Sequence, residues 1–412
     1  MSTAQSPSLL SGIMITAGSA IGAGMFSLPI VSSGMWWWYS LGCLFFLWLL
    51  NYLAALYLLE VNLQFSPGAS FDTIATNILG STWNTLIGLS VAFLMYILLY
   101  AYFSAFGNIV TQTLQWDIFN SSTWWQGVMS LALGCLLGVI VWWSTAAVGR
   151  ISTILVGGMV ITFILSIGGF ALQIEPAKLF NQSTASTDYF PFVWAALPYY
   201  MTSLGYATLV PSLYKFYGRD VGRIKNSLLG GSLIAAGVYA LFLLVAFGNI
   251  SRQEFIAINE AGGNIGHLVN AFEKGQSSSL INTALRIFSN FAIVSSFLGI
   301  SLGLFDYIAD KFSFANTAKG RLYTACLTFL PAGIASFFFP NGFIAAIGYA
   351  GLMMIFGFFI APFFMIRKTR KNSQATTFQV GGGMTLLLFF LLASLLVGVC
   401  KILTILKLLP QW

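Results

Sequence analysis

Long apolar stretches, separated by short polar segments, make up almost the whole chain. About 20 helical residues cross the hydrocarbon core of a bilayer, and eleven stretches reach roughly that length. The predicted spans are 9–34, 36–61, 83–114, 125–144, 150–173, 189–214, 226–249, 279–310, 320–338, 341–366 and 383–408. A longer polar stretch, 250–277, is predicted to form short helices on the outer surface. The pattern therefore predicts an all-α polytopic membrane protein.

Composition and charge agree with this pattern and orient the chain. Only 7% of the 412 residues are charged, whereas soluble domains carry about 25%. With the N-terminus placed in the cytoplasm, 12 of the 18 Lys and Arg residues fall on the cytoplasmic side, as the positive-inside rule requires. An odd number of spans then puts the C-terminus on the opposite side of the membrane.

The first span, 9–34, is predicted to be interrupted near its middle. Gly18, Gly22 and Gly24 lie close together and Pro29 follows, and both residue types weaken a helix interior. Lipid offers no hydrogen-bond partners, so such a break is tolerated only inside protein or beside a cavity. Its free N–H groups suit a carboxylate, and its free C=O groups suit an ammonium or a metal cation. Glycines that merely allow close helix packing are the alternative interpretation.

A second interruption is predicted in the span 189–214, which has Gly205 near its middle and Pro211 beyond. The two interrupted spans are five spans apart, so they cross the membrane in opposite directions. Interrupted helices at matching places in two halves are typical of transporters built from inverted repeats. The predicted organisation is a single membrane domain, 1–412, made of the repeats 9–173 and 189–366 and the added helix 383–408.

One face of the span 83–114 carries aromatic side chains. Tyr96, Tyr100, Phe103 and Gly107 follow one another at spacings of four, three and four residues, which places them on the same side of a helix. The rings could wall a pocket, and a phenol there could hydrogen-bond a carboxylate. Ordinary aromatic packing is the alternative interpretation.

Polar and charged side chains inside spans are costly and therefore informative. In the span 279–310, the hydroxyls of Ser295 and Ser296 either coordinate a small cation, together with carbonyls from the first break, or bond back to their own helix. Glu60 and Asp306 lie at the cytoplasmic ends of their spans. They are either simple helix-end charges or members of a cytoplasmic gate or proton path.

The chemistry missing from the spans argues against several classes of protein. The spans contain no nucleophile–base pair, metal cluster or phosphate loop, so we expect neither an enzyme nor a cofactor other than a coupling ion. The chain has no basic domain for nucleic acid, no polar stripe for a channel, and no feature that requires a protein partner. A transporter that holds a zwitterion largely through backbone atoms fits best. The alternative, a non-transporting amino acid sensor, is expected to carry a cytoplasmic output domain.

Short motifs along nearly the whole chain carry a family resemblance. They are Gly22–Pro29, Ser70–Ile74, Tyr96–Leu98, Tyr100–Tyr102, Gly262–Ile265, Phe288–Ala292, Ser295–Gly299, Gly303–Tyr307, Phe339–Phe343 and Gly348–Gly351. Together they resemble the bacterial hydroxy/aromatic amino acid permeases of the amino acid/polyamine/organocation superfamily, the tryptophan-permease branch in particular. The resemblance implies a LeuT-type five-plus-five inverted repeat with an eleventh transmembrane helix and with helices 1 and 6 broken. It also implies the bacterial inner membrane, with a cytoplasmic N-terminus and a periplasmic C-terminus.

The resemblance further implies a site for an aromatic L-amino acid at the two breaks. For the substrate carboxylate it implies Gly22, Ala23 and Gly24. For the ammonium it implies the carbonyls of Ala20 and Tyr200 and the hydroxyl of Ser203. It places Tyr206, next to Gly205 of the unwound segment, against the substrate side chain, with Tyr200 as an outer lid and Tyr100 as the hydroxyl of the span 83–114. Phe103 and Tyr349 are expected to add to aromatic selectivity. Tryptophan is expected first, then tyrosine and phenylalanine.

The coupling ion is left open between H⁺ and Na⁺. The family is associated with proton symport, for which Glu60 and Asp306 are the acidic candidates. A Na⁺ site is implied at the carbonyls of Gly18, Ile21 and Ala292 and the hydroxyls of Ser295 and Ser296. One position departs from the family, whose members typically carry an aromatic-His-Gly triplet where this chain has Tyr206-Ala207-Thr208.

Overall fold

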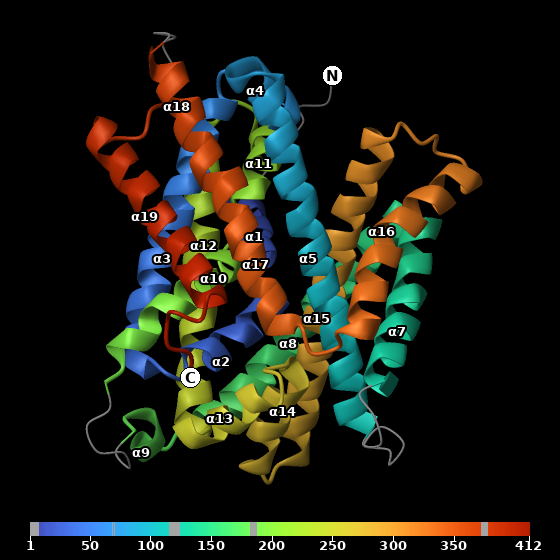
Figure 1. Ribbon diagram of the computed structural model, residues 1–412, viewed down its shortest axis with the longest axis vertical. Coiled ribbons are helices and arrows are strands. Elements are labelled where there is room, and N and C mark those ends of the chain that lie inside the picture. The colour runs from blue at the N-terminus through green and yellow to red at the C-terminus, as the bar shows by residue number, and fades with distance from the viewer. Residues whose placement is uncertain (1–7, 68, 70, 115–123, 182–187, 372–377) are drawn as a thin grey trace.

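Every regular element in the described part of the chain is a helix (Figure 1). The computed structural model describes residues 8–67, 69, 71–114, 124–181, 188–371 and 378–412, so Ser70 of one family-like motif lies outside the described residues.

The long helices are α3 (Trp36–Asn62), α5 (Ser81–Leu114), α7 (Trp124–Trp143), α8 (Thr145–Ala171), α12 (Val221–Asn249), α15 (Ser279–Lys311), α16 (Ala318–Phe338) and α19 (Gly383–Ile405). The others are α1 (Leu9–Ala20), α2 (Ser27–Ser32), α4 (Phe71–Leu79), α9 (Pro176–Leu179), α10 (Val193–Ser203), α11 (Val210–Tyr217), α13 (Arg252–Glu260), α14 (Ile265–Lys274), α17 (Phe343–Ile355) and α18 (Ala361–Lys371). Short 3₁₀ turns are η1 (Ala23–Phe26), η2 (Phe190–Phe192) and η3 (Ala207–Leu209), and the π-helix η4 (Phe356–Ile360) joins α17 to α18.

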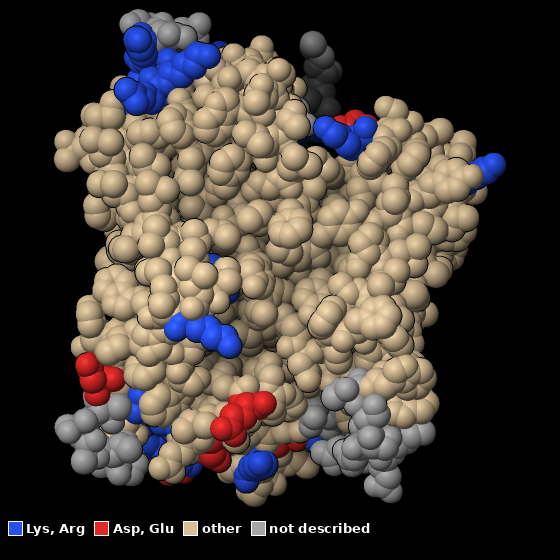
Figure 2. All heavy atoms as spheres, in the orientation of Figure 1, with Lys and Arg blue, Asp and Glu red and all other residues tan. Residues whose placement is uncertain are grey.

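The helices form a membrane-spanning bundle. In the described part of the chain, nine helices are long and apolar enough to cross a bilayer, with α17, η4 and α18 counted as one, and a bent pair of shorter helices brings the number to ten. On the face that Figure 2 shows, few charged side chains lie between the two ends of the molecule. The predicted class, an all-α polytopic membrane protein, is therefore confirmed.

The first predicted span is the bent pair. α1 ends at Ala20, Ile21 and Gly22 are extended, and the helical segment Ala23–Ser32 continues at an angle of 48°. The extended backbone at Gly22 (φ −150°, ψ −175°) stops the helix. Pro29 lies in the first turn of α2, where a missing N–H is tolerated. The interruption predicted for this span is thus present.

The predicted sixth span also consists of two helices. α10 has 11 residues and α11 has 8, so neither is long enough to cross a membrane alone. Between them, Leu204, Gly205 and Tyr206 are not helical, and the short turn η3 follows. Pro211 lies in the first turn of α11, a position that proline favours.

α1 packs closely along α12 because Gly231 of α12 has no side chain to separate the two helices. A Cβ atom at Gly231 would lie 2.4 Å from Cβ of Thr16 and 2.7 Å from the carbonyl oxygen of Ile13. About two turns further along α12, the hydroxyl of Tyr239 reaches the end of α1. α12 therefore supports the first helix beside its break.

The two ends of the bundle differ. In Figure 1, α4, α11, the outer end of α18 and the N-terminus lie at one end, which we call the N-terminal end. α9, α13 and α14 lie at the opposite end, the α13 end. Figure 2 shows Lys and Arg side chains gathered over α18 at the N-terminal end.

Arg252 of α13 fixes the second half of the first interrupted helix. Its side chain is buried, and its Nε and Nη2 donate to the carbonyls of Ser33 (3.2 Å) and Gly34 (2.8 Å), just past the end of α2. Carbonyls at a helix C-terminus favour a cation. The guanidinium also lies 3.5 Å from the ring centroid of Trp412. Arg252 therefore ties α13 and the end of the chain to α2.

Candidate functional site

A cavity of about 430 Å³ lies where the two interrupted helices meet. Its walls come from both interruptions and from α5, α8, α12, α15 and α17. Its volume is in the range of small-molecule sites, about 300–1,000 Å³. The predicted site residues that line it are Gly18, Ala20, Ile21, Gly22, Gly24, Ser203, Gly205, Tyr206, Ser295 and Ser296.

The other predicted site residues do not line the cavity; they are Ala23, Tyr100, Phe103, Tyr200, Ala292, Tyr349, Glu60 and Asp306. The Tyr100 hydroxyl donates to the carbonyl of Phe339 at 2.8 Å. The buried Phe103 ring packs against Phe297, with 5.3 Å between ring centroids. The predicted aromatic face of α5 thus contacts other helices.

Tyr200 and Tyr349 lie on other sides of the bundle core. The buried Tyr200 hydroxyl is hydrogen-bonded to Ser32 at 2.7 Å, and its carbonyl accepts the N–H of Leu204 at 3.1 Å. The Tyr349 ring is 41% exposed and lies 4.8 Å from Nζ of Lys401 on α19. Neither side chain is placed to contact a molecule in the cavity.

Two tyrosines that the sequence reasoning missed do line the cavity. α5 contributes Leu98 and Tyr102, one turn apart, and the Tyr102 phenol lies against Ser296. α12 contributes Tyr239. A signal for Tyr239 was available, because it is the single tyrosine of the apolar span 226–249.

The first interruption brings backbone N–H groups to one side of the cavity. The N–H of Ala23 donates to Oγ of Ser296 at 3.1 Å. Gly24 approaches α10 so closely that a Cβ atom there would lie 3.2 Å from Oγ and 3.4 Å from Cα of Ser203. Rotation of the Ser296 hydroxyl about one torsion would free the Ala23 N–H for an anion.

The opposite side of the first interruption presents carbonyl oxygens. Ala20 is the last residue of α1, and Ser203 is the last residue of α10. Both carbonyls face the Tyr239 hydroxyl, at 2.7 Å and 2.8 Å respectively. The cavity therefore has donor and acceptor backbone groups within a few residues of each other.

The implied cation ligands come from the end of α1 and from α15; Gly18, Ile21, Ser295 and Ser296 line the cavity, and Ala292 does not. Oγ of Ser295 donates to the carbonyl of Ala292 at 3.2 Å, so this pair bonds within its own helix. Gly18 leaves open space, since no atom lies within 4 Å of the position of a Cβ. Carbonyl and hydroxyl oxygens suit a hard cation. Over the described ranges, no three His, Cys, Asp and Glu side chains gather to hold a metal ion.

Comparison with known proteins agrees with the motifs. Residues 5–401 match the tryptophan/tyrosine permease family. The chain belongs to this family. A tryptophan-specific transport protein of Pseudomonas aeruginosa is 44% identical over 406 residues, which cover 98% of this chain and 97% of the relative. A tryptophan-specific transport protein of Shigella flexneri is 43% identical over 410 residues (100% and 98% covered), and a tyrosine permease of Enterobacter agglomerans is 36% identical over 410 residues (98% and 98%).

Membership in this family makes the chain a transport permease and not an enzyme, as the sequence predicted. Together with its apolar helices, it identifies a multi-pass inner-membrane protein.

In this permease, four phenylalanines pack together between the cavity and the α13 end. Phe26, just past the first interruption, lies 5.4 Å from Phe242 and 5.4 Å from Phe288 between ring centroids. Phe288 lies 5.2 Å from Phe163. On α8, α12 and α15, these rings lie about one to two turns from the cavity residues, on the side of the α13 end. We call these four residues the aromatic seal.

A second cavity extends the path toward the N-terminal end. It measures about 290 Å³ and shares Thr208 with the central cavity. Phe71 of α4, and Tyr307 and Asp310 near the end of α15, also line it. The second cavity thus lies beside the central cavity, on the side of the N-terminal end.

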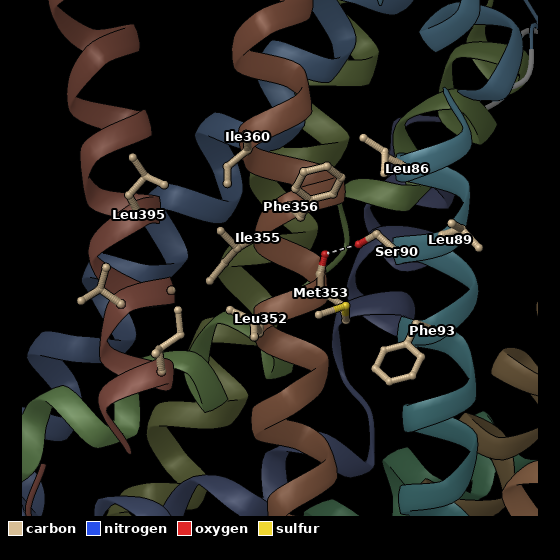
Figure 3. A pocket seen from close by; sticks show the side chains of 13 residues that line it. Leu86, Leu89, Ser90, Phe93, Leu352, Met353, Ile355, Phe356, Ile360 and Leu395 are labelled. Carbon is tan, nitrogen blue, oxygen red and sulfur yellow. Dashed lines mark hydrogen bonds between the residues drawn. The ribbon is translucent and has the colours of Figure 1, made fainter. Parts of the chain in front are cut away.

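A larger groove, about 630 Å³, lies between α5, α17 and α19 (Figure 3). Its lining is apolar apart from Ser90, whose hydroxyl donates to the carbonyl of Met353 at 2.8 Å. Leu89 and Phe93 are exposed on its rim, at the depth of the apolar helices. The groove offers no groups for a zwitterion, so its size does not make it the transport site.

The acidic candidates for ion coupling lie away from the central cavity. Glu60 at the end of α3 is 1% exposed, and its two carboxylate oxygens each accept a hydrogen bond from Arg370 at 2.8 Å. The N–H of Val380 also donates to this carboxylate at 2.8 Å. The pair thus joins α3 to α18 and to the segment before α19. Asp306 is exposed on α15.

Proposed function

We propose that this permease imports an aromatic L-amino acid, tryptophan in preference to tyrosine and phenylalanine. The observation that carries the proposal is the central cavity, where two helix interruptions present N–H and C=O groups beside aromatic walls. Such a site holds both charges of a zwitterion without a charged side chain. The names of the relatives, two tryptophan-specific transport proteins and a tyrosine permease, support the same substrate class.

In the proposed pose, the two charged groups of the substrate span the first interruption. The carboxylate accepts from the N–H groups of Ala23 and Gly24 once Ser296 has released Ala23. The ammonium faces the carbonyls of Ala20 and Ser203 on the other side. Only Ile21 and Gly22 separate the two sets of groups, which fits a molecule whose charges share one carbon atom.

The substrate ring is proposed to lie against Tyr206 and Tyr102. Both rings belong to the cavity wall, and a ring–ring contact contributes about 0.5–1.5 kcal/mol beyond burial. Tyr100, Phe103 and Tyr349 are left out of the pose because they lie outside the cavity. Their neighbours on α16, α15 and α19 give them packing roles.

The two interruptions also support a LeuT-type fold with five-plus-five inverted repeats. The first repeat would comprise α1 to α8, the second α10 to α18, and α19 would be the eleventh transmembrane helix. The interruptions fall at corresponding places, in the first helix of each half. Transport by alternating access follows from such an architecture, since one half can rock against the other around a fixed site.

The cavity is then proposed to face the cytoplasm. Most Lys and Arg residues are assigned to the side of the N-terminus, which the positive-inside rule makes cytoplasmic. The C-terminus would be periplasmic. The second cavity leads toward the cytoplasmic side, and the aromatic seal closes the periplasmic side. Opening to the periplasm requires Phe26 to move away from Phe242 and Phe288.

Concentrative import needs a coupling ion, and two candidates remain. The oxygen ligands of Gly18, Ile21, Ala292, Ser295 and Ser296 favour Na⁺ on chemical grounds. The family resemblance favours H⁺. In either case, Oγ of Ser296 on α15 accepts a hydrogen bond from the Ala23 N–H. A cation bound to Ser296 would compete for this oxygen and so favour an Ala23 N–H that is free to bind the substrate carboxylate.

The variant Ser296→Ala is expected to abolish the dependence of uptake on the coupling ion, because it removes one cation ligand and the partner of the Ala23 N–H. The measurement is tryptophan uptake against ion concentration. Ser301→Ala is the matched control, since this buried hydroxyl on the same helix bonds back to Leu298 at 3.2 Å. Unchanged ion dependence in Ser296→Ala would remove the cation site from the proposal.

The whole proposal is tested by labelled tryptophan uptake into proteoliposomes that contain the purified protein. A pH gradient and a Na⁺ gradient are imposed in separate experiments. Accumulation under either gradient supports import and identifies the ion. If tryptophan neither accumulates nor binds, and tyrosine and phenylalanine behave alike, the proposed substrate class is wrong.

A further inference from the structure

Tyr239 joins the ends of the two interrupted helices through a single hydroxyl group. The side chain is 1% exposed and comes from α12. Its oxygen lies 2.7 Å from the carbonyl oxygen of Ala20 and 2.8 Å from that of Ser203. These are the last helical residues of α1 and α10.

The Tyr239 hydroxyl has fewer hydrogen atoms to donate than there are carbonyl oxygens around it. A phenol carries one O–H hydrogen, so Tyr239 can make a full hydrogen bond to only one of the two carbonyls at a time. Three oxygens therefore share one hydroxyl hydrogen, and the Gly22 N–H is the other donor beside the phenol oxygen. Both carbonyls also lie at helix C-termini, where partial negative charge accumulates. Such a cluster favours a cationic donor that brings several N–H groups.

We propose that Tyr239 forms the ammonium receptor together with the carbonyls of Ala20 and Ser203. A protonated amine has three N–H donors, one for each of the three oxygens. The phenol would donate its hydrogen to one carbonyl and accept an N–H from the substrate. This inference rests on the proposed function and adds a specificity-determining side chain to a site otherwise made of backbone.

The position of Tyr239 supports this role. Its hydroxyl lies on the carbonyl side of the first interruption, with Ile21 and Gly22 between it and the Ala23 N–H. Burial within α12 keeps the phenol in place, and Gly231 on the same helix fixes α12 against α1. In this arrangement, one hydroxyl group contacts the substrate amine and the ends of both interrupted helices.

The test is the variant Tyr239→Phe, which keeps the ring and removes the hydroxyl. Binding of tryptophan, tryptamine and indole-3-propionate is measured in Na⁺-free buffer, so that only the amine supplies a cation. Tryptophan and tryptamine are expected to bind at least tenfold more weakly, because a hydrogen bond to a charged group is lost. Indole-3-propionate, which lacks the amine, is expected to change less than twofold.

Tyr214→Phe is the matched control. Tyr214 is also a buried phenol that donates to a backbone carbonyl, that of Phe65, at 2.8 Å, but it does not line the central cavity. It should leave the ratio of the three affinities unchanged. This control separates a general loss of packing from a loss of amine recognition.

Several results would overturn the inference. Unchanged or tighter tryptophan binding in Tyr239→Phe would mean that the hydroxyl only occupies the carbonyls. An equal loss for indole-3-propionate, or a loss confined to Na⁺ buffer, would assign the oxygens to another role. If the variant does not fold, wild-type protein can still overturn the inference: indole-3-propionate that binds as tightly as tryptophan would mean that the oxygens do not bind the amine. Wild-type protein that binds no tryptophan either with or without Na⁺ would instead refute the proposed function.

Discussion

Replacing Glu60 with alanine is expected to lower the stability of this permease by about 3–5 kcal/mol, the usual cost of leaving a buried charge without its partner. The carboxylate is 1% exposed and receives two hydrogen bonds from Arg370 and one from the Val380 N–H. Its loss leaves Nε of Arg370 and the Val380 N–H without their partner at the junction of α3, α18 and the segment before α19, whereas Nη2 of Arg370 keeps its hydrogen bond to the Val380 carbonyl at 3.1 Å. Thermal or denaturant unfolding of purified protein in detergent measures the effect.

Two controls identify the cause. The double variant Glu60→Ala/Arg370→Ala removes both charges and should cost less than the two single variants together. Glu175→Ala breaks an exposed pair with Lys178 and should change stability little. A loss of less than about 1 kcal/mol for Glu60→Ala would contradict a structural role for the buried pair.

The variant Gly24→Val is expected to eliminate tryptophan binding. A Cβ atom at this position would lie 3.2 Å from Oγ and 3.4 Å from Cα of Ser203, so the Cβ alone already crowds the end of α10, and valine adds two further methyl groups. They must either enter the cavity or push the end of α10 away. In both cases the proposed carboxylate and ammonium groups lose their mutual geometry. Equilibrium binding of labelled tryptophan is the measurement.

Gly168→Val on α8 is the matched control, because no atom lies within 4 Å of the Cβ position there and the site is exposed. Gly168→Val is the same substitution as Gly24→Val, but its Cβ atom has no close neighbour. Wild-type affinity in Gly24→Val would refute the proposed pose. Loss of binding in both variants would point instead to a general defect in folding.

The helix interruptions could be predicted from the sequence because lipid makes an unpaired backbone expensive. Gly22 and Gly205 then mark places where the chain must find other partners, and the structure places a cavity at both. Spans follow from length and apolarity alone. The spans and their interruptions depend on the membrane as a solvent, and they could therefore be predicted from a single sequence.

The aromatic wall could not be assigned in the same way. α5 is apolar around its whole circumference, so the spacing of Tyr96 and Tyr100 fixes a shared face but not its direction. In the structure, both hydroxyls donate to carbonyls of the α16 region, those of Leu327 and Phe339. Tyr102, two residues further on, faces the cavity instead. The packing of neighbouring helices decides this, and a single sequence does not contain it.

The partners of Glu60 and Tyr239, which lie far away along the chain, could not be predicted from the sequence either. Glu60 could be recognised as a costly charge near a helix end, yet Arg370 is 310 residues away along the chain. The shared contacts of Tyr239 likewise join residues from three distant helices. Such pairs arise from tertiary packing, and local patterns identify only one member of each.

The aromatic seal also sets a conformational equilibrium. Its three ring contacts join Phe26 to Phe242, Phe26 to Phe288 and Phe163 to Phe288. Opening to the periplasm separates the two contacts of Phe26; at about 0.5–1.5 kcal/mol each, their loss alone disfavours the opposite-facing conformation by a factor of roughly 5 to 160. In the proposed transport cycle, these contacts therefore lower the fraction of molecules ready to accept substrate from the periplasm. The rate of capture then depends on how far the driving ion raises that population, as well as on affinity.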